Sequence, residues 1–230
     1  MESGGLIMQA GKSGVLIPMG EIELEAELTI PRQARGLVLF AHGSGSSRHS
    51  PRNQFVAGVL QESGIATLLF DLLTVAEEEE EAYTRHLRFD MPLLADRLLR
   101  ATLWVAEQEI TRQFNLGYFG SSTGAAAALM AAAALGEKIN SVVSRGGRPD
   151  LAGPALERVT AATLLVVGGN DIQVIALNQE ACARLRCEKE LKIIPGATHL
   201  FEEPGALEKV SRLAANWFLQ HMAQPAVHPS

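Results

Sequence analysis

The sequence predicts a doubly wound α/β fold, in which helices cover both faces of a mostly parallel sheet of about eight strands. Two kinds of segment that alternate along the chain predict this fold. Short, largely apolar runs, typical of strands buried on both faces, occur at residues 37–40, 66–70, 116–119, 139–143, 163–167 and 191–194. Stretches with helical periodicity lie between them, at 51–62, 90–109, 123–135, 175–185 and 205–221. Such alternation indicates right-handed crossover connections.

The N-terminal segment predicts an antiparallel hairpin at the edge of this sheet. From Glu21 to Ile30 polar and apolar residues alternate, which is typical of a strand with one face in water. We expect this strand to pair with Val15–Pro18. Since no linker, repeat or low-complexity stretch interrupts the chain, residues 1–230 are expected to form one domain, with 224–230 as a disordered tail.

Composition separates the chain from several classes of protein. Its 230 residues are 47% hydrophobic and 20% charged, which provides enough apolar surface for a core and excludes a disordered chain. The net charge of −6 argues against nucleic acid or an anionic membrane as the partner, because both are bound through lysine and arginine. A small-molecule substrate fits this charge better, and a homodimer is left open.

Targeting and redox signals are absent from the sequence. The chain does not start with basic residues followed by an apolar run, as a secretory signal would. The uncharged stretch 113–136 is too rich in alanine to hold a span in lipid. Cys182 and Cys187 are the only cysteines and have no histidine close by, so we expect neither disulfides nor a metal site. These features predict a cytoplasmic protein.

A serine flanked by glycines follows the strand predicted at 116–119. Residues 120–124, Gly-Ser-Ser-Thr-Gly, match the G-x-S-x-G pattern between a strand and a helix, where a tight turn exposes Ser122. Side chains at the glycine positions would clash where the strand meets the helix. The helix that follows directs free amides and the positive end of its dipole toward a developing oxyanion. The alternative is a small-residue turn without a catalytic role.

An acid and a histidine follow later strands in the order that a hydrolase triad of this architecture uses. Asp171 is the only acid in the loop after the strand at 163–167, and His199 follows the strand at 191–194. An imidazole removes the proton of a serine hydroxyl, and a carboxylate orients the imidazole. We therefore predict the triad Ser122–Asp171–His199. Taken singly, Asp171 could cap a helix and His199 could be an ordinary loop residue.

The loop after the strand at 37–40 predicts a second oxyanion donor. The loop begins His-Gly-Ser, and an amide from this position complements the amide of the residue after the nucleophile. We expect the backbone amides of Ser44 and Thr123 to form the oxyanion hole.

The same loop offers a different reading as a dinucleotide site. Gly43 and Gly45 begin a G-x-G pattern after a strand, and Asp71 follows the next strand, where an acid would bind ribose. Arg48 stands where the third glycine of the pattern belongs, which disfavours this alternative. The predicted chemistry needs no organic cofactor and no metal.

Four basic residues fall at the predicted carboxyl ends of strands, where such a sheet binds ligands: Arg48, His49, Arg145 and Arg148. One hypothesis is that an arginine binds a substrate carboxylate or phosphate through two hydrogen bonds. The other, which we favour, is that these residues pair with loop acids such as Asp150 or Glu202.

Two connections bear on access to the site. The segment 144–162 is too short for a lid domain, which predicts an uncapped site and favours small or soluble acyl substrates. The longer connection 71–89 could overhang the site. Within it, the run Glu77–Glu81 is expected to be a solvated loop or the start of a helix rather than a functional acidic segment.

Five segments together resemble the α/β-hydrolase fold family, and more closely its dienelactone hydrolase-like branch. They are AHGSGSSRHSPRN (41–53), GYFGSSTGAAAAL (117–129), VVSRGGRPDL (142–151), VVGGNDIQV (166–174) and IPGATHLFEEPG (194–205). The resemblance implies an α/β-hydrolase fold without a cap domain. Founding members of the branch use a cysteine nucleophile, so Ser122 favours a general esterase. The chain is also similar to the hydrolase part of proteins that carry a phosphoribosyltransferase domain, which this sequence lacks.

These observations predict a serine hydrolase that cleaves carboxylic esters through an acyl-enzyme intermediate. An acyltransferase or a peptidase would use the same triad and is the nearest alternative. A non-catalytic binding or scaffold protein on the same fold is the alternative from another class.

Overall fold

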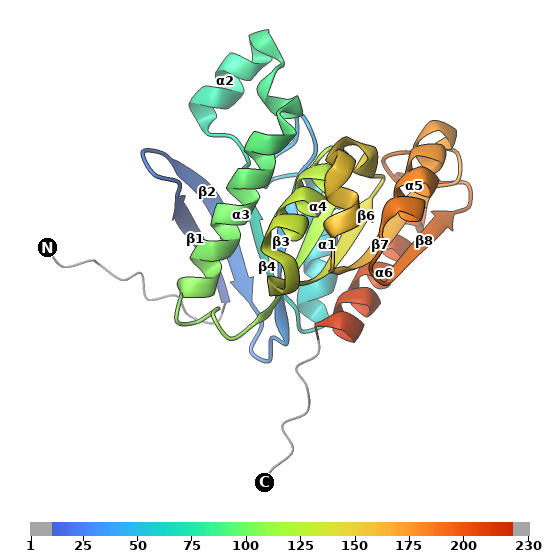
Figure 1. The fold of residues 1–230 in the computed structure, drawn as a ribbon. Helices are drawn as coiled ribbons and strands as arrows, with labels where there is room; N and C mark the ends of the chain where they lie inside the picture. The colour runs from blue at the N-terminus through green and yellow to red at the C-terminus, as the bar shows by residue number, and fades with distance from the viewer. Residues whose placement is uncertain (1–10, 223–230) are drawn as a thin grey trace, which may run out of the picture.

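Helices lie on both faces of one eight-stranded sheet in the computed structural model, which describes residues 11–222 (Figure 1). The strand order is β1-β2-β4-β3-β5-β6-β7-β8. This confirms the predicted doubly wound, mostly parallel sheet. The strands are β1 Gly11–Pro18, β2 Glu23–Ile30, β3 Gly36–Ala41, β4 Ala66–Phe70, β5 Asn115–Ser121, β6 Ile139–Arg145, β7 Ala162–Gly168 and β8 Lys189–Ile194.

The hairpin at the N-terminal edge is antiparallel, as predicted. β1 pairs with β2 in a register that places Val15 opposite Ala26, and β2 pairs antiparallel with β4. The alternating sequence of β2 is matched by alternating burial along the strand. All other strand pairs are parallel.

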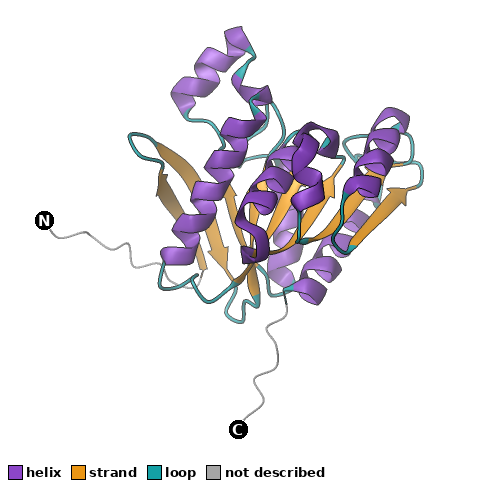
Figure 2. Ribbon diagram, in the orientation of Figure 1, coloured by secondary structure: helices purple, strands orange, loops and turns teal. Residues whose placement is uncertain are grey.

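Helices pack against both faces of the sheet (Figure 2). α3, α4 and α5 cover the face turned toward the viewer, and α1 and α6 lie behind the sheet, where they contact each other. The helices are α1 Pro51–Glu62, α2 Val75–Thr84, α3 Met91–Glu107, α4 Gly124–Leu135, α5 Ile172–Arg184 and α6 Ala206–His221. Short 3₁₀ helices lie at Leu87–Phe89, Gly136–Lys138 and Pro149–Arg158.

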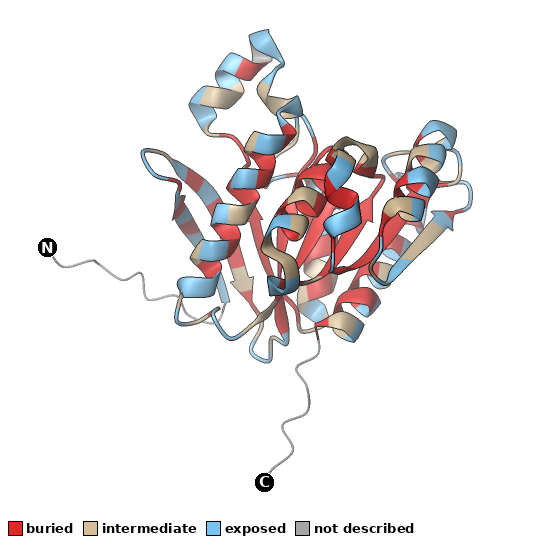
Figure 3. Cartoon of the chain, viewed as in Figure 1, coloured by how far each residue is buried: buried red, intermediate tan, exposed pale blue. Residues whose placement is uncertain are grey.

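The core has two layers because the parallel strands are buried on both faces (Figure 3). In β5, Tyr118 packs into the layer beneath α3 and α4, while Phe119 packs into the layer beneath α1 and α6. The Tyr118 hydroxyl lies 2.5 Å from Thr102 Oγ1, so its polar end is satisfied in the core. The apolar runs at 37–40, 66–70 and 163–167 therefore correspond to strands without a wet face. The prediction of two buried faces is wrong for the run at 191–194, because β8 is an edge strand in which Ile193 is exposed.

The acidic run lies at the start of a helix, as one of the two predicted alternatives had it. Glu77–Glu81 begins in the first turn of α2, where Thr74 and Glu77 form a capping box. The predicted solvation of the run is only partly right. Glu77 pairs with Arg97, and Glu81 has no exposed side-chain surface and accepts a 2.6 Å hydrogen bond from Arg88. Both basic partners lie well downstream of the acidic run, so the local sequence gives no sign of them.

The connection that contains α2 stands at the carboxyl edge of the sheet. It starts where β4 ends, and β4 runs parallel to β3, so the loop after β3 lies at the same edge. Ser44 Oγ donates to the carbonyl oxygen of Arg88 at 3.1 Å and joins the two segments. α2 itself rises above this edge (Figure 1).

Two further predictions concern the ends of the chain and the membrane. The predicted tail at 224–230 lies outside the described residues, and the assignment of 1–230 to one domain stays a prediction. Within residues 11–222, no helix has the length and apolar character needed to cross a bilayer.

Candidate active site

Ser122 occupies a strained turn between β5 and α4. β5 ends at Ser121 and α4 begins at Gly124, so only two residues connect them. Ser122 has φ of 51°, in the left-handed region that residues with a side chain rarely adopt. Such strain is kept where the surrounding structure enforces it, and it is the geometry of a nucleophile elbow.

The glycines around Ser122 are required by close backbone contacts. A Cβ atom at Gly120 would lie 2.5 Å from Ala125 Cα, and one at Gly124 would lie 2.2 Å from the carbonyl oxygen of Ala41. Both distances are far below van der Waals contact. The G-x-S-x-G pattern is therefore explained by the packing of α4 against β5 and β3.

His199 and Asp171 form a hydrogen-bonded pair at the same edge of the sheet. His199 Nδ1 lies 2.7 Å from Asp171 Oδ2, and the side chains are 39% and 16% exposed. Asp171 precedes α5, but its side chain makes no capping hydrogen bond. The carboxylate instead accepts a hydrogen bond from Nδ1–H, which leaves Nε2 as the nitrogen that can act as a base.

Ser122 and His199 each lie next to residues at the end of β6. The Ser122 amide donates to the Arg145 carbonyl oxygen at 3.2 Å, and a Cβ at Gly146 would lie 3.0 Å from the His199 carbonyl oxygen and 3.5 Å from its Nδ1. Among the described side chains, no hydrogen bond joins Ser122 to His199. Catalytic hydrogen bonds are often long before substrate binds and shorten in the complex.

The predicted oxyanion residues lie together but interact in a way the sequence did not reveal. The Ser44 amide donates to Thr123 Oγ1 at 3.0 Å, and this hydroxyl also lies 2.9 Å from Ser44 Oγ. The Thr123 hydroxyl thus accepts the hydrogen bond of the Ser44 amide, which was expected to bind the substrate oxyanion. An oxyanion at this position must replace the Thr123 hydroxyl as the acceptor of the Ser44 amide.

His42 supports the predicted oxyanion loop, a structural role that sequence reasoning missed. Its Nε2 accepts a 3.0 Å hydrogen bond from the Leu72 amide, and its Nδ1 lies 3.0 Å from the Gly43 carbonyl oxygen. Burial lowers the pKa of His42, so the ring is neutral with its proton on Nδ1. His42 thereby holds the loop after β3 against the loop after β4.

Among the described residues, neither Arg48 nor His49 has a hydrogen bond or ion pair with Ser122. Arg48 pairs with Asp71 and Glu25, and its amide also donates to Asp71 at 2.7 Å. His49 is exposed. Asp71, the acid of the dinucleotide alternative, is therefore engaged by arginine.

Arg148 and Arg145 differ in their partners. Arg148 makes two hydrogen bonds to Asp150, of 2.9 and 2.8 Å, and these raise the pKa of Arg148. Arg145 is buried, and it pairs with neither Asp150 nor Glu202. The partner of Glu202 is Arg52, at 3.1 Å, a residue that the sequence did not single out.

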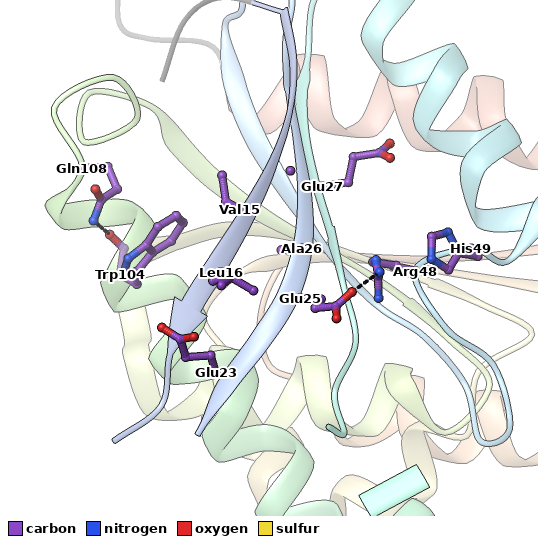
Figure 4. Close-up of a pocket in the computed structure, with 11 residues that line it drawn as sticks. Val15, Leu16, Glu23, Glu25, Ala26, Glu27, Arg48, His49, Trp104 and Gln108 are labelled. Atoms are coloured by element: carbon purple, nitrogen blue, oxygen red, sulfur yellow. Dashed lines mark hydrogen bonds and ion pairs between the residues drawn. The ribbon is translucent and has the colours of Figure 1, made fainter. Parts of the chain in front are cut away.

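A large hollow lies at the β1–β2 hairpin rather than at Ser122. It has a volume of about 620 Å³, and none of Ser122, Asp171 and His199 lines it. In Figure 4 the hairpin runs between Arg48 and His49 on one side and Trp104 and Gln108 on the other. The hollow therefore wraps round the edge of the sheet.

A second hollow lies closer to the predicted oxyanion loop. It has a volume of about 490 Å³ and is lined by residues of the segment 45–52 and by Glu78. Among residues 11–222, no group of three or more histidine, cysteine, aspartate or glutamate side chains is arranged to hold a metal. Cys182 and Cys187 are free thiols.

Comparisons with known proteins point to one family. A dienelactone hydrolase from Anabaena variabilis has a structure that matches with a TM-score of 0.91 at 56% identity, over 94% of this chain and 100% of that one. Est1E from Butyrivibrio proteoclasticus matches with a TM-score of 0.75 at 17% identity, over 90% of this chain and 98% of that one, which shows the fold alone. No family model matches the chain.

Curated relatives are longer than this chain. A Mycobacterium tuberculosis protein with the provisional name phosphoribosyl transferase is 54% identical over 211 residues, which are 92% of this chain and 47% of the relative. The chain thus spans about half the length of the curated relatives it matches.

Proposed function

Because the chain belongs to the dienelactone hydrolase family of α/β-hydrolases, we propose that it is a serine hydrolase that cleaves carboxylic esters. The observation that carries the proposal is the His199–Asp171 hydrogen bond beside the strained turn of Ser122. A serine hydroxyl becomes an effective nucleophile when an oriented imidazole removes its proton. The proposed chemistry uses side chains and backbone amides of this chain and needs no cofactor or metal.

In the proposed reaction, His199 Nε2 takes the proton of Ser122 as Oγ attacks the ester carbonyl. Asp171 holds the ring in the required tautomer and stabilises the imidazolium that forms. His199 then gives the proton to the leaving alcohol, and an acyl-enzyme remains. A water molecule, deprotonated by His199, releases the acid and restores Ser122.

The amides of Thr123 and Ser44 bind the oxyanion in this proposal. Thr123 directly follows the nucleophile, and Ser44 lies within hydrogen-bonding distance of the Thr123 side chain. In the free protein, the Thr123 hydroxyl satisfies the Ser44 amide, and the negatively charged oxygen of the tetrahedral intermediate replaces it. Charge-assisted hydrogen bonds are stronger than neutral ones, which favours this exchange in the transition state.

Small or soluble esters are the proposed substrates. The connection after β6 contains only the 3₁₀ helix Pro149–Arg158, so no lid domain with an apolar lining covers Ser122 from this side. A lactone is an internal ester, and the dienelactone hydrolase relative supports including lactones among the substrates. The proposed setting is the cytoplasm.

Activity toward a series of p-nitrophenyl esters and a simple lactone tests the proposal. We expect higher kcat/KM for acetate and butyrate esters than for laurate, and loss of activity in Ser122→Ala and His199→Gln. Ser211→Ala, which removes a hydroxyl hydrogen-bonded within α6, is the matched control and should retain wild-type rates. Full activity of a folded Ser122→Ala protein would contradict the proposal.

A further inference from the structure

Arg145 is a buried cation without a partner. It is the last residue of β6 and is 7% exposed. Its Nε and one terminal nitrogen, Nη1, are fully buried and find no hydrogen-bond partner anywhere in 11–222. A native protein rarely leaves a buried charged donor unsatisfied, so such a group marks the place of a ligand, an ion or water.

Several other buried or half-buried arginines of this fold have a carboxylate partner. Arg97, the other buried arginine described, pairs with Glu77 and donates to the carbonyl oxygen of Leu72. Half-buried arginines at the same edge of the sheet also have carboxylate partners: Arg48 with Asp71, Arg88 with Glu81 and Arg148 with Asp150. Arg145 is the exception, which indicates that its counter-charge is meant to come from outside the chain.

A second arginine also has an orphaned donor. Arg52 Nε is buried without a partner among the described residues, although Nη1 of the same side chain lies 3.1 Å from Glu202. Burial and, to a smaller degree, the charge of Arg52 lower the pKa of Arg145 to about 10. Both side chains thus have orphaned donors, and the charge of Arg52 acts on Arg145.

We propose that Arg145 and Arg52 bind an oxyanion, a carboxylate or a phosphate group, beside the predicted catalytic serine. A guanidinium presents two parallel N–H donors that match the oxygens of these groups. The binding site adjoins Ser122 because Arg145 lies opposite Ser121 in the β5–β6 register. In addition, the Arg145 carbonyl oxygen accepts a hydrogen bond from the Ser122 amide. Arg52 also lines the hollow of about 490 Å³ near the predicted oxyanion loop, so an anion can reach Arg52 from solvent.

Anion binding goes beyond the proposed ester hydrolysis, and it can be measured without an ester substrate. Thermal unfolding of the full chain is followed with rising inorganic phosphate or succinate at constant ionic strength. At about 100 times the dissociation constant, a ligand that binds only the folded state raises the melting temperature by about 5 to 10 °C for a chain of this size. We expect this rise in the wild type with one or both ions.

Two variants and one control connect the rise to the proposed site. Arg145→Met removes the buried cation and should abolish the response, while its melting temperature without anion should equal or exceed that of the wild type. Arg52→Gln, at a less buried position, should weaken binding about tenfold. Arg148→Gln removes a nearby cation that Asp150 already neutralises, and it should respond like the wild type. A wild type that responds to neither ion, or an equal response in Arg145→Met, would overturn the proposal.

Esters distinguish an anion carried by the substrate from a free ion. The ratio of kcat/KM for mono-p-nitrophenyl succinate to that for p-nitrophenyl butyrate is compared between wild type and Arg145→Met. A ratio that falls at least about tenfold assigns the site to an anionic group of the substrate. An unchanged ratio together with a lost phosphate response assigns the site to a free ion, and the anion site still stands. An inactive wild type that responds to phosphate would contradict the esterase and leave the anion site supported.

Discussion

Asp171 precedes α5 at the position of a helix cap, yet its carboxylate binds His199 Nδ1 at 2.7 Å and makes no hydrogen bond to the helix. An aspartate at this position usually accepts from the first amides of the helix. Here the histidine takes that place. The arrangement separates the contribution of Asp171 to catalysis from its contribution to stability, which a substitution can test.

Asp171→Asn should lower kcat by about 10⁴-fold, because asparagine cannot hold the His199 tautomer that leaves Nε2 free. The melting temperature should change little, since the carboxylate does not cap α5 and asparagine caps helices equally well. Steady-state ester hydrolysis and thermal unfolding check the two parts. A large fall in melting temperature with the same fall in kcat would indicate that Asp171 is mainly structural.

Ser122→Gly and Ser122→Ala both remove the hydroxyl, but they should differ in stability. At φ of 51°, glycine avoids the clash of a Cβ atom that alanine keeps, a strain of about 1 kcal/mol or more. We expect both variants to be inactive and Ser122→Gly to melt about 2 to 4 °C above Ser122→Ala. Equal melting temperatures would show that the turn relaxes and stores no strain.

Gly124→Ala should destabilise the fold by about 1–3 kcal/mol, because the added Cβ would meet the carbonyl oxygens of Ala41 and His42 at 2.2 and 2.4 Å. Gly58→Ala is the matched control within α1, where nothing lies within 4 Å of the new Cβ. Alanine there should stabilise the helix by about 0.5–1 kcal/mol. Urea unfolding measures both changes, and the same sign for both would refute the packing argument.

Because His42 is buried, we expect the fold to lose stability at mildly acidic pH. Burial lowers its pKa in the folded protein, so the unfolded chain binds more protons once the pH falls below the unfolded value of 6.5. The stability from the neutral ring is complete above that value and is lost as the pH falls toward the folded pKa. Between pH 7.5 and 5, the advantage of the wild type over His42→Gln in melting temperature should therefore shrink. A constant or growing advantage contradicts this assignment.

Local patterns in the sequence were sufficient to predict the sheet and the neighbourhood of Ser122. The inner strands appear as largely apolar runs because both of their faces are buried, and the glycine at 120 is required by contacts within one strand–turn–helix unit. Asp171 and His199 follow successive parallel strands, whose carboxyl ends meet at one edge. Their hydrogen bond was therefore predictable from topology.

Side-chain contacts between distant segments could not be predicted in the same way. The Thr123 hydroxyl reaches the Ser44 amide only when the loops after β3 and β5 meet. Arg52 and Arg145 come from α1 and β6, and no spacing in the sequence relates them. Each pairing depends on the rotamers and exact packing of the folded chain, which periodicity does not encode.

Covalent labelling of Ser122 tests the central proposal most directly. The wild type and Ser122→Ala are treated with a fluorophosphonate, which reacts with activated serines, and the intact proteins are weighed. An activated Ser122 predicts one adduct on the wild type and none on Ser122→Ala. No adduct on a folded wild type, or the same adduct on both proteins, would contradict Ser122 as the nucleophile.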